Sequence, residues 1–185
     1  MDVNYGCVAI GASAGGVQAI RRIVNGLPYQ LRAPLLITIH APATSRLERV
    51  LRFDSNLNIQ CAIHGMILRP GVIYTVPGET DAKIHGDRFV LNEALRHDGQ
   101  FASIDSLMSS IAFTFQAAAT GIILSGMLRD GVAGMRMIEE SGGRTIVQDP
   151  HEAEFADLPI SVLERCADAE VKTTAEISNW LLEHY

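Results

Sequence analysis

Residues 8–20, VAIGASAGGVQAI, contain the signal that decides the fold. An apolar run stops at Gly11, Ser13 stands among small residues, and a helical pattern begins after Gly16. A strand, a tight turn and a helix in this order are typical of two kinds of site: a phosphate-binding loop and a turn that presents a nucleophile.

The rest of the chain alternates apolar strands with amphipathic helices. The strands are predicted at residues 5–11, 33–40, 120–126, 142–149 and 169–173, and the helices at 17–27, 45–53, 103–119, 132–141, 158–166 and 174–185, the last with Thr174 as its cap. This alternation predicts an α/β fold, with a doubly wound, mostly parallel sheet covered by helices on both faces. We expect residues 1–185 to form one domain.

The segment between residues 58 and 94 is predicted to consist of short strands and turns rather than alternating strands and helices. NIQCAIHG (58–65) and GVIYTVPG (71–78) read as short strands with turns, and AKIH (82–85) and RFVL (88–91) flank Gly86-Asp87. A Gly-Asp pair between two such runs predicts a two-residue turn, so the last two strands should form a small antiparallel hairpin insert.

Composition and charge exclude several classes of function. The 185 residues are 48% hydrophobic and carry a net charge of −6, which argues against a nucleic-acid partner. No apolar stretch approaches the ~20 residues of a spanning helix, so direct membrane insertion is not expected. The three cysteines are far apart and form no CxxC pair, which speaks against a disulfide framework or a zinc site and favours a reducing cytoplasm.

The two interpretations of Ser13 can be compared on the residues. A dinucleotide fingerprint needs GxGxxG and an acidic residue after the next strand, whereas Ser13 replaces the second glycine and the next strand ends in His40. GASAG fits the GxSxG pattern of a nucleophile turn, where the following helix directs its free amides at the reacting centre. A turn residue that merely caps the helix is the remaining alternative.

His40 and Asp130 strengthen the nucleophile interpretation. Ser13 and Asp130 each follow a predicted strand and His40 ends a third, and the carboxyl ends of parallel strands lie on one edge of the sheet. Ser13 could therefore act as nucleophile, His40 as general base and then acid, and Asp130 as the group that orients the imidazole. Taken singly, His40 could be an ordinary polar residue, and Asp130 could cap the helix at 132–141.

A family resemblance joins these motifs. GASAGG (11–16), His40, LSGMLRDGVAG (124–134) and QDPHEAEFADLP (148–159), together with RPGVIYTVPG (69–78), resemble the CheB-type methylesterases of bacterial chemotaxis. The similarity extends along nearly the whole chain, and the set of motifs is far more specific than GxSxG alone.

The resemblance implies a serine hydrolase that removes methyl groups from glutamyl methyl esters of chemoreceptor cytoplasmic helices and often deamidates receptor glutamines. It carries the catalytic triad over to Ser13, His40 and Asp130, and the oxyanion site to the backbone of Met127 and Ala14. It implies neither a metal nor an organic cofactor. A serine esterase or amidase of the same fold with another substrate, or a catalytically weak signalling relative, stays open as an alternative.

The chain departs from the family pattern in two ways. Many relatives carry a phosphorylatable receiver domain before the hydrolase domain, whereas here no such domain precedes Met1, so the chain is either a freestanding member or a fragment. A basic, proline-containing segment of relatives is replaced by Gln100, Phe101 and Ala102, and an Arg-His pair after the PG turn is replaced by residues 79–81, Glu-Thr-Asp. We expect Gln100 and Phe101 to lie near the substrate and the acidic residues to favour a less acidic partner.

Overall fold

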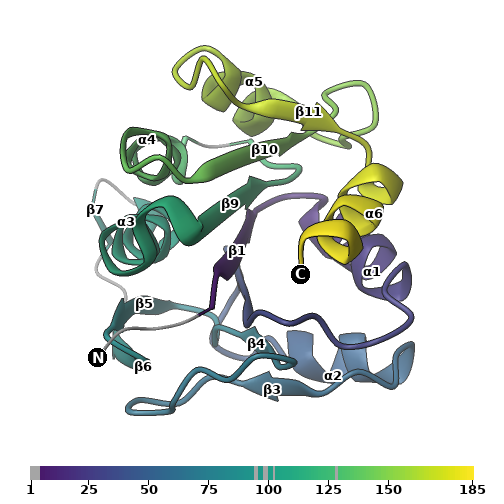
Figure 1. Ribbon diagram of the computed structural model, residues 1–185, viewed down its shortest axis with the longest axis vertical. Coiled ribbons are helices and arrows are strands. Elements are labelled where there is room, and N and C mark those ends of the chain that lie inside the picture. Colours follow the sequence, from purple (N-terminus) through teal and green to yellow (C-terminus); the bar gives the residue numbers. More distant parts are fainter. Residues whose placement is uncertain (1–4, 94–95, 98–99, 102, 128) are drawn as a thin grey trace.

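The computed structural model describes residues 5–93, 96–97, 100–101, 103–127 and 129–185. Its centre is a seven-stranded parallel sheet with the order β11-β10-β9-β1-β2-β4-β3 (Figure 1). The strands are β1 Cys7–Ala12, β2 Leu35–Ile39, β3 Ile59–Cys61, β4 Ile73–Thr75, β9 Ala119–Ile123, β10 Arg144–Gln148 and β11 Glu170–Lys172. This sheet confirms the predicted fold class.

Helices cover both faces of the sheet (Figure 1). One face packs against α1 Gly16–Asn25, α2 Leu47–Phe53 and α6 Thr174–His184. The other packs against α3 Ser103–Phe115, α4 Val132–Glu140 and α5 Asp157–Leu163. The short 3-10 helix Gln116–Ala118 joins α3 to β9. Two apolar cores result, one on each side of the sheet, and β1 contributes alternate residues to both.

The position of β1 decides where a site can form. Every residue of β1 is buried, and the strand pairs with β2 on one side and with β9 on the other. The helix after β1 lies on one face of the sheet, whereas the helix after β9 lies on the opposite face. In doubly wound sheets, ligands bind where such connections diverge, outside the carboxyl ends of the strands. This point lies between β1 and β9.

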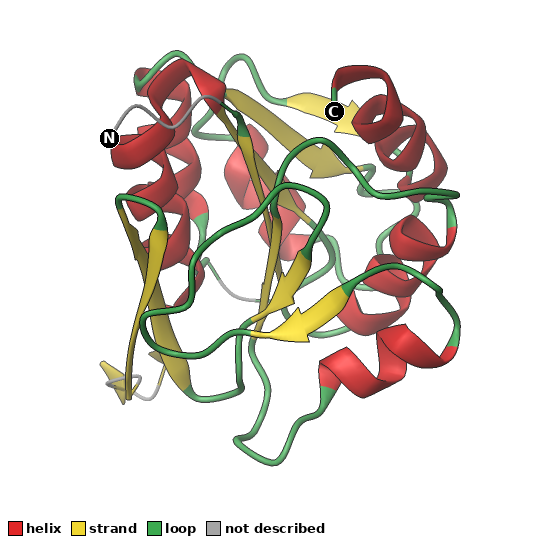
Figure 2. Ribbon diagram, turned by 60° about the horizontal axis from the view of Figure 1, so that its bottom comes forward, coloured by secondary structure: helices red, strands yellow, loops and turns green. Residues whose placement is uncertain are grey.

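The predicted hairpin is present. Strands β5 Thr80–His85 and β6 Arg88–Glu93 pair antiparallel, with His85 opposite Arg88 across the Gly86-Asp87 turn. Gly86 has φ 61°, a conformation that favours glycine. The hairpin stands apart from the central sheet and packs against α3 (Figure 2). A further small antiparallel pair, β7 Arg96–His97 and β8 Gln100–Phe101, follows it.

The predicted N-cap of the last helix is wrong by one residue. Thr173, not Thr174, is the N-cap of α6, since its side chain accepts a hydrogen bond from the amide of Glu176 while the Glu176 carboxylate accepts from the amide of Thr173. The Thr174 hydroxyl instead donates to Glu152. Within the described residues, no helix combines the length and the apolar character needed to cross a membrane.

Candidate active site

Ser13 stands in the turn between β1 and α1. Its amide donates to the carbonyl of Ser125 over 3.0 Å, and its carbonyl accepts from the amide of Gly16. The N-cap of α1 is Gly15, whose φ of 75° allows the sharp turn, and no described side chain caps this helix. The interpretation of Ser13 as a helix cap is therefore wrong, and its hydroxyl is available for another partner.

That partner is His40, the residue directly after β2. The amide of His40 donates to the carbonyl of Ala12, so the end of β2 is fixed against the end of β1. The Nδ1 atom of His40 lies 3.3 Å from the Ser13 Oγ. This distance is at the loose end of a hydrogen bond, as is common for a catalytic pair without substrate.

Asp130 approaches the other side of the imidazole. Its Oδ2 lies 2.6 Å from the Nε2 of His40, and the side chains of His40 and Asp130 are 12% and 5% exposed. A carboxylate only accepts hydrogen bonds, so the proton of the neutral imidazole resides on Nε2 and the Nδ1 lone pair faces Ser13. The structure thus brings together the three side chains that the sequence placed at three strand ends.

The Asp130 carboxylate is fixed by backbone amides. The amide of Ile104 donates to Oδ2 and that of Asp105 to Oδ1, each over 2.9 Å. Both donors belong to the first turn of α3, where amides lack partners within the helix. Asp130 therefore caps α3 rather than α4, whose N-cap is Gly131, and this corrects the alternative interpretation of Asp130.

A second carboxylate lies behind Asp130. Asp105 accepts a hydrogen bond of 2.7 Å from the amide of Gly134, so it connects the start of α3 to the start of α4. Burial raises the pKa of Asp105, and the nearby charge of Asp130 adds to this, although the bond from Gly134 acts in the opposite direction. Asp105 positions α4 against α3 beside the candidate triad.

Ser125, which the sequence interpretation did not single out, supports the nucleophile turn. Its carbonyl accepts from Ser13, and its hydroxyl donates to the carbonyl of Ala14 over 2.7 Å and accepts from the amide of Phe155 over 3.0 Å. A side chain at Gly15 would meet the Ser125 hydroxyl at 2.5 Å, so this close approach also requires glycine. The sequence feature that could have identified Ser125 is its position at the carboxyl end of a central strand, beside Gly126.

The amides expected to bind an oxyanion belong to Ala14 and Met127. Among the described residues, neither amide donates to a protein acceptor. Gly126, beside Met127, lies close to Ser13, since a Cβ added to it would be 3.0 Å from the Ser13 Cβ. The Met127 side chain is 55% exposed. Gln100 and Phe101 form strand β8, and their side chains lie outside the described residues.

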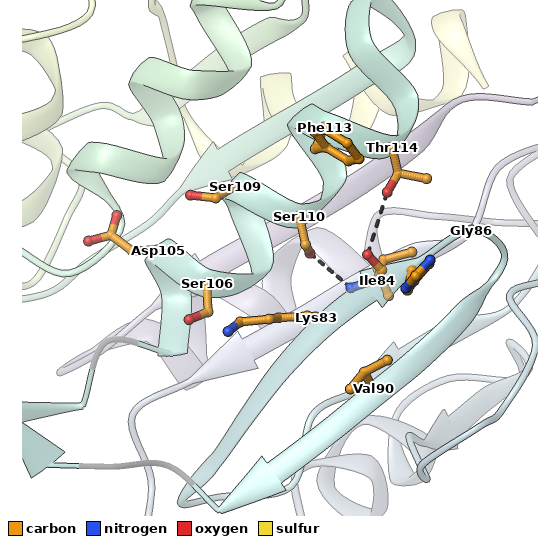
Figure 3. Close-up of a pocket in the computed structure, with 11 residues that line it drawn as sticks. Lys83, Ile84, Gly86, Val90, Asp105, Ser106, Ser109, Ser110, Phe113 and Thr114 are labelled. Carbon is orange, nitrogen blue, oxygen red and sulfur yellow. Dashed lines mark hydrogen bonds between the residues drawn. The ribbon is translucent and has the colours of Figure 1, made fainter.

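Asp105 also marks one end of a groove between α3 and the hairpin (Figure 3). The groove has a volume of about 630 Å³, and Phe113, 83% exposed, lies toward its far end. The Ser110 hydroxyl accepts from the amide of Ile84, which holds the hairpin on α3. In the described part of the chain, no three His, Cys, Asp or Glu side chains gather as a metal site would require.

The family model of the CheB methylesterases matches residues 8–181. The chain belongs to the CheB methylesterase family. This confirms the resemblance found in the sequence, and it makes the protein a member of a family of carboxylic ester hydrolases.

Named CheB relatives agree with this assignment. The protein-glutamate methylesterase/protein-glutamine glutaminase 3 of Anaeromyxobacter dehalogenans is 34% identical over 163 residues, 85% of this chain and 48% of that one. The protein-glutamate methylesterase FrzG of Myxococcus xanthus is 30% identical over 97% of this chain and 54% of its own. The chain spans about half the length of these two relatives, but 86% of a Leptospira interrogans relative that is 34% identical.

A solved CheB structure has the same fold. The crystal structure of the Thermotoga maritima CheB methylesterase catalytic domain superposes with a TM-score of 0.88 at 27% sequence identity, covering 98% of this chain and 99% of that chain. The similarity therefore includes the parallel sheet, both helix layers and the hairpin region.

Proposed function

We propose that this CheB family member hydrolyses glutamyl methyl esters on the cytoplasmic helices of chemoreceptors, with Ser13 as nucleophile. The observation that carries the proposal is the series of contacts from the Ser13 hydroxyl to His40 and from His40 to a buried, amide-bound Asp130. Residues 1–185 would act as one catalytic domain in the cytoplasm.

The first half of the proposed reaction forms an acyl-enzyme. The Nδ1 of His40 takes the Ser13 proton as the hydroxyl oxygen attacks the ester carbonyl, and Asp130 stabilises the imidazolium that results. The tetrahedral oxyanion lies against the amides of Ala14 and Met127, at the positive end of α1. His40 then returns the proton to the departing oxygen, so methanol leaves and a glutamyl ester of Ser13 remains.

The second half regenerates the enzyme. Water attacks the Ser13 ester with His40 again as base, and the products are a glutamate side chain and the free serine. A receptor glutamine can enter the same sequence with ammonia in place of methanol, which would give the deamidation named for several relatives. None of these steps requires a redox change.

The experiment that tests this function is methanol release from a chemoreceptor carrying radiolabelled methyl esters. Wild-type protein should release labelled methanol, and Ser13→Ala should not. An esterase of the same fold with another substrate would hydrolyse p-nitrophenyl acetate but leave the receptor methylated. A non-catalytic signalling relative would do neither, and either result would refute the proposal.

A further inference from the structure

A second cavity opens on the other side of Asp105, between α4 and α5. Its volume is about 290 Å³, and its charged and hydroxyl-bearing lining residues are Asp105, Arg129, Arg136, Ser161, Glu164 and Arg165. We call this cavity the arginine pocket. Three of the 15 lysines and arginines of a chain with a net charge of −6 thus converge on one small cavity.

Two of the three guanidinium groups of the arginine pocket have no ion-pair partner among the described residues. Arg136 pairs with Glu140 on its own helix over 2.8 Å, whereas Arg129 and Arg165 form no ion pair with a described carboxylate. The Asp105 carboxylate accepts a hydrogen bond from the amide of Gly134. Asp105 and Glu164 are the two carboxylates that line the pocket, so the groups available to a ligand are the guanidinium groups of Arg129 and Arg165.

The arginine pocket adjoins the candidate triad through the chain and through hydrogen bonds. Arg129 directly precedes Asp130, the partner of His40. The amide of Asp105 donates to Asp130 while the Asp105 side chain lines the pocket. The pocket lies beside the starts of α3 and α4, which are at the carboxyl edge of the sheet where Ser13 also stands.

We infer that the arginine pocket binds a carboxylate side chain of the substrate polypeptide, close to the ester that Ser13 attacks. The inference rests on the proposed function. Guanidinium groups match carboxylates in shape and charge, and Arg129 and Arg165 offer donors that nothing in the described protein uses. Each turnover converts a neutral ester into a carboxylate, so a polypeptide with several esters gains ligands for the pocket as it is processed.

The pocket gives the surface around the triad a charge polarity. The hairpin side carries Glu79 and also Asp81, which pairs with Lys83 over 3.4 Å, while the α4–α5 side carries the three arginines. A bound helix should therefore be favoured when its acidic residues lie on one side of the ester and disfavoured when they lie on the other. This asymmetry distinguishes a pocket for a substrate carboxylate from a general attraction to acidic proteins.

The test uses helical peptides that contain one glutamyl methyl ester and a single glutamate or glutamine at three, four or seven residues before or after it. These positions lie on the ester's own face of a helix and reach about 10 Å from it. Methanol release gives kcat/KM for each peptide with wild-type protein, Arg165→Gln and the double variant Arg129→Gln/Arg165→Gln. Arg69→Gln is the matched control, since Arg69 is an exposed arginine that does not line the pocket.

Wild-type protein should prefer glutamate over glutamine about fivefold at positions on one side of the ester only, the size expected of an exposed charge pair. Arg165→Gln should reduce this preference, the double variant should abolish it, and Arg69→Gln should retain it. The absence of a one-sided preference in wild type, or its persistence in the double variant, would overturn the inference.

A measurement of peptide binding tests the inference without requiring turnover. A fluorescein-labelled peptide with glutamate in place of the ester should bind wild-type protein about fivefold more tightly with the favoured second glutamate than with glutamine. Arg165→Gln should reduce the difference and the double variant should remove it, whereas equal dissociation constants in wild type would refute the pocket. If no peptide releases methanol, the proposed function fails while this binding result still decides the inference.

Discussion

Replacing Asp130 by asparagine should reduce ester hydrolysis far more than the loss of one charge at a surface would. Asp130 accepts hydrogen bonds at both oxygens: Oδ2 from Ile104 and His40, and Oδ1 from Asp105. An asparagine has only one accepting oxygen, so each of its two orientations places an NH₂ group against a donor.

The two orientations of the asparagine side chain would disrupt the triad in different ways. With NH₂ at the Oδ2 position, His40 must accept at Nε2, its proton moves to Nδ1, and Nδ1 can no longer take the proton of Ser13. With NH₂ at the Oδ1 position, the tautomer is kept, but the amide of Asp105 loses its acceptor and the imidazolium loses its counter-charge. Each orientation leaves a buried amide unpaired, which costs about 1–3 kcal/mol of unfolding free energy.

We expect Asp130→Asn to lower kcat for p-nitrophenyl acetate by about 10³–10⁴, since a wrong tautomer alone costs on the order of 10⁴ in the best-studied triad. Asp149→Asn is the matched control, because Asp149 also follows a central strand, but its side chain accepts from one described donor, the nearby amide of His151. Nitrogen-15 shifts of His40 should show a proton on Nε2 in the wild type and a mixture of tautomers in the variant. Turnover by Asp130→Asn within tenfold of the wild type would refute this account of the triad.

Three further substitutions test other parts of the structure. Ser125→Ala removes the bond to Ala14 and leaves the part-buried amide of Phe155 without its acceptor, so kcat should fall about tenfold with little change in KM. Ser125→Thr should restore kcat, and equal rates in both variants would contradict the positioning role. The pKa of Asp105 is raised in the folded protein, so its stabilising contribution is complete below an aspartate's ordinary pKa of about 4 and is lost as the pH rises through the raised value. The unfolding free energy of wild-type protein, measured by denaturation between pH 4 and 7, should therefore fall relative to that of Asp105→Asn as the pH rises. A difference between the two proteins that stays constant with pH would exclude this effect. Thr173→Ala should lower the unfolding free energy by about 1 kcal/mol in urea denaturation without changing turnover, because only the cap of α6 is lost, and an unchanged urea midpoint would argue against the cap.

Much of the fold could be predicted because its signals are local. The apolar runs that became β1, β2, β9 and β10 are fully or almost fully buried strands, and the Gly86-Asp87 turn specifies its hairpin within a few residues. The places of β3 and β4 in the sheet were not predicted, since parallel pairing of short strands depends on contacts between segments distant in the sequence.

The candidate site likewise has parts that local sequence signals predict and parts that depend on contacts between distant segments. Strand ends could be located from the sequence, and they brought Ser13, His40 and Asp130 to one edge. The amides that bind Asp130 come from α3, a helix 25 or more residues away in the sequence, and no local pattern connects them. The support that Ser125 gives to the nucleophile turn and the convergence of three arginines near α4 likewise depend on the packed helices.

The central claim is that Ser13 is a nucleophile activated by His40. The most direct measurement treats the protein with a fluorophosphonate and locates the adduct by mass spectrometry. We predict one adduct per chain, on Ser13, with labelling strongly slowed in His40→Ala and absent in Ser13→Ala. An adduct on another residue, or labelling of Ser13 that proceeds equally fast without His40, would contradict the account.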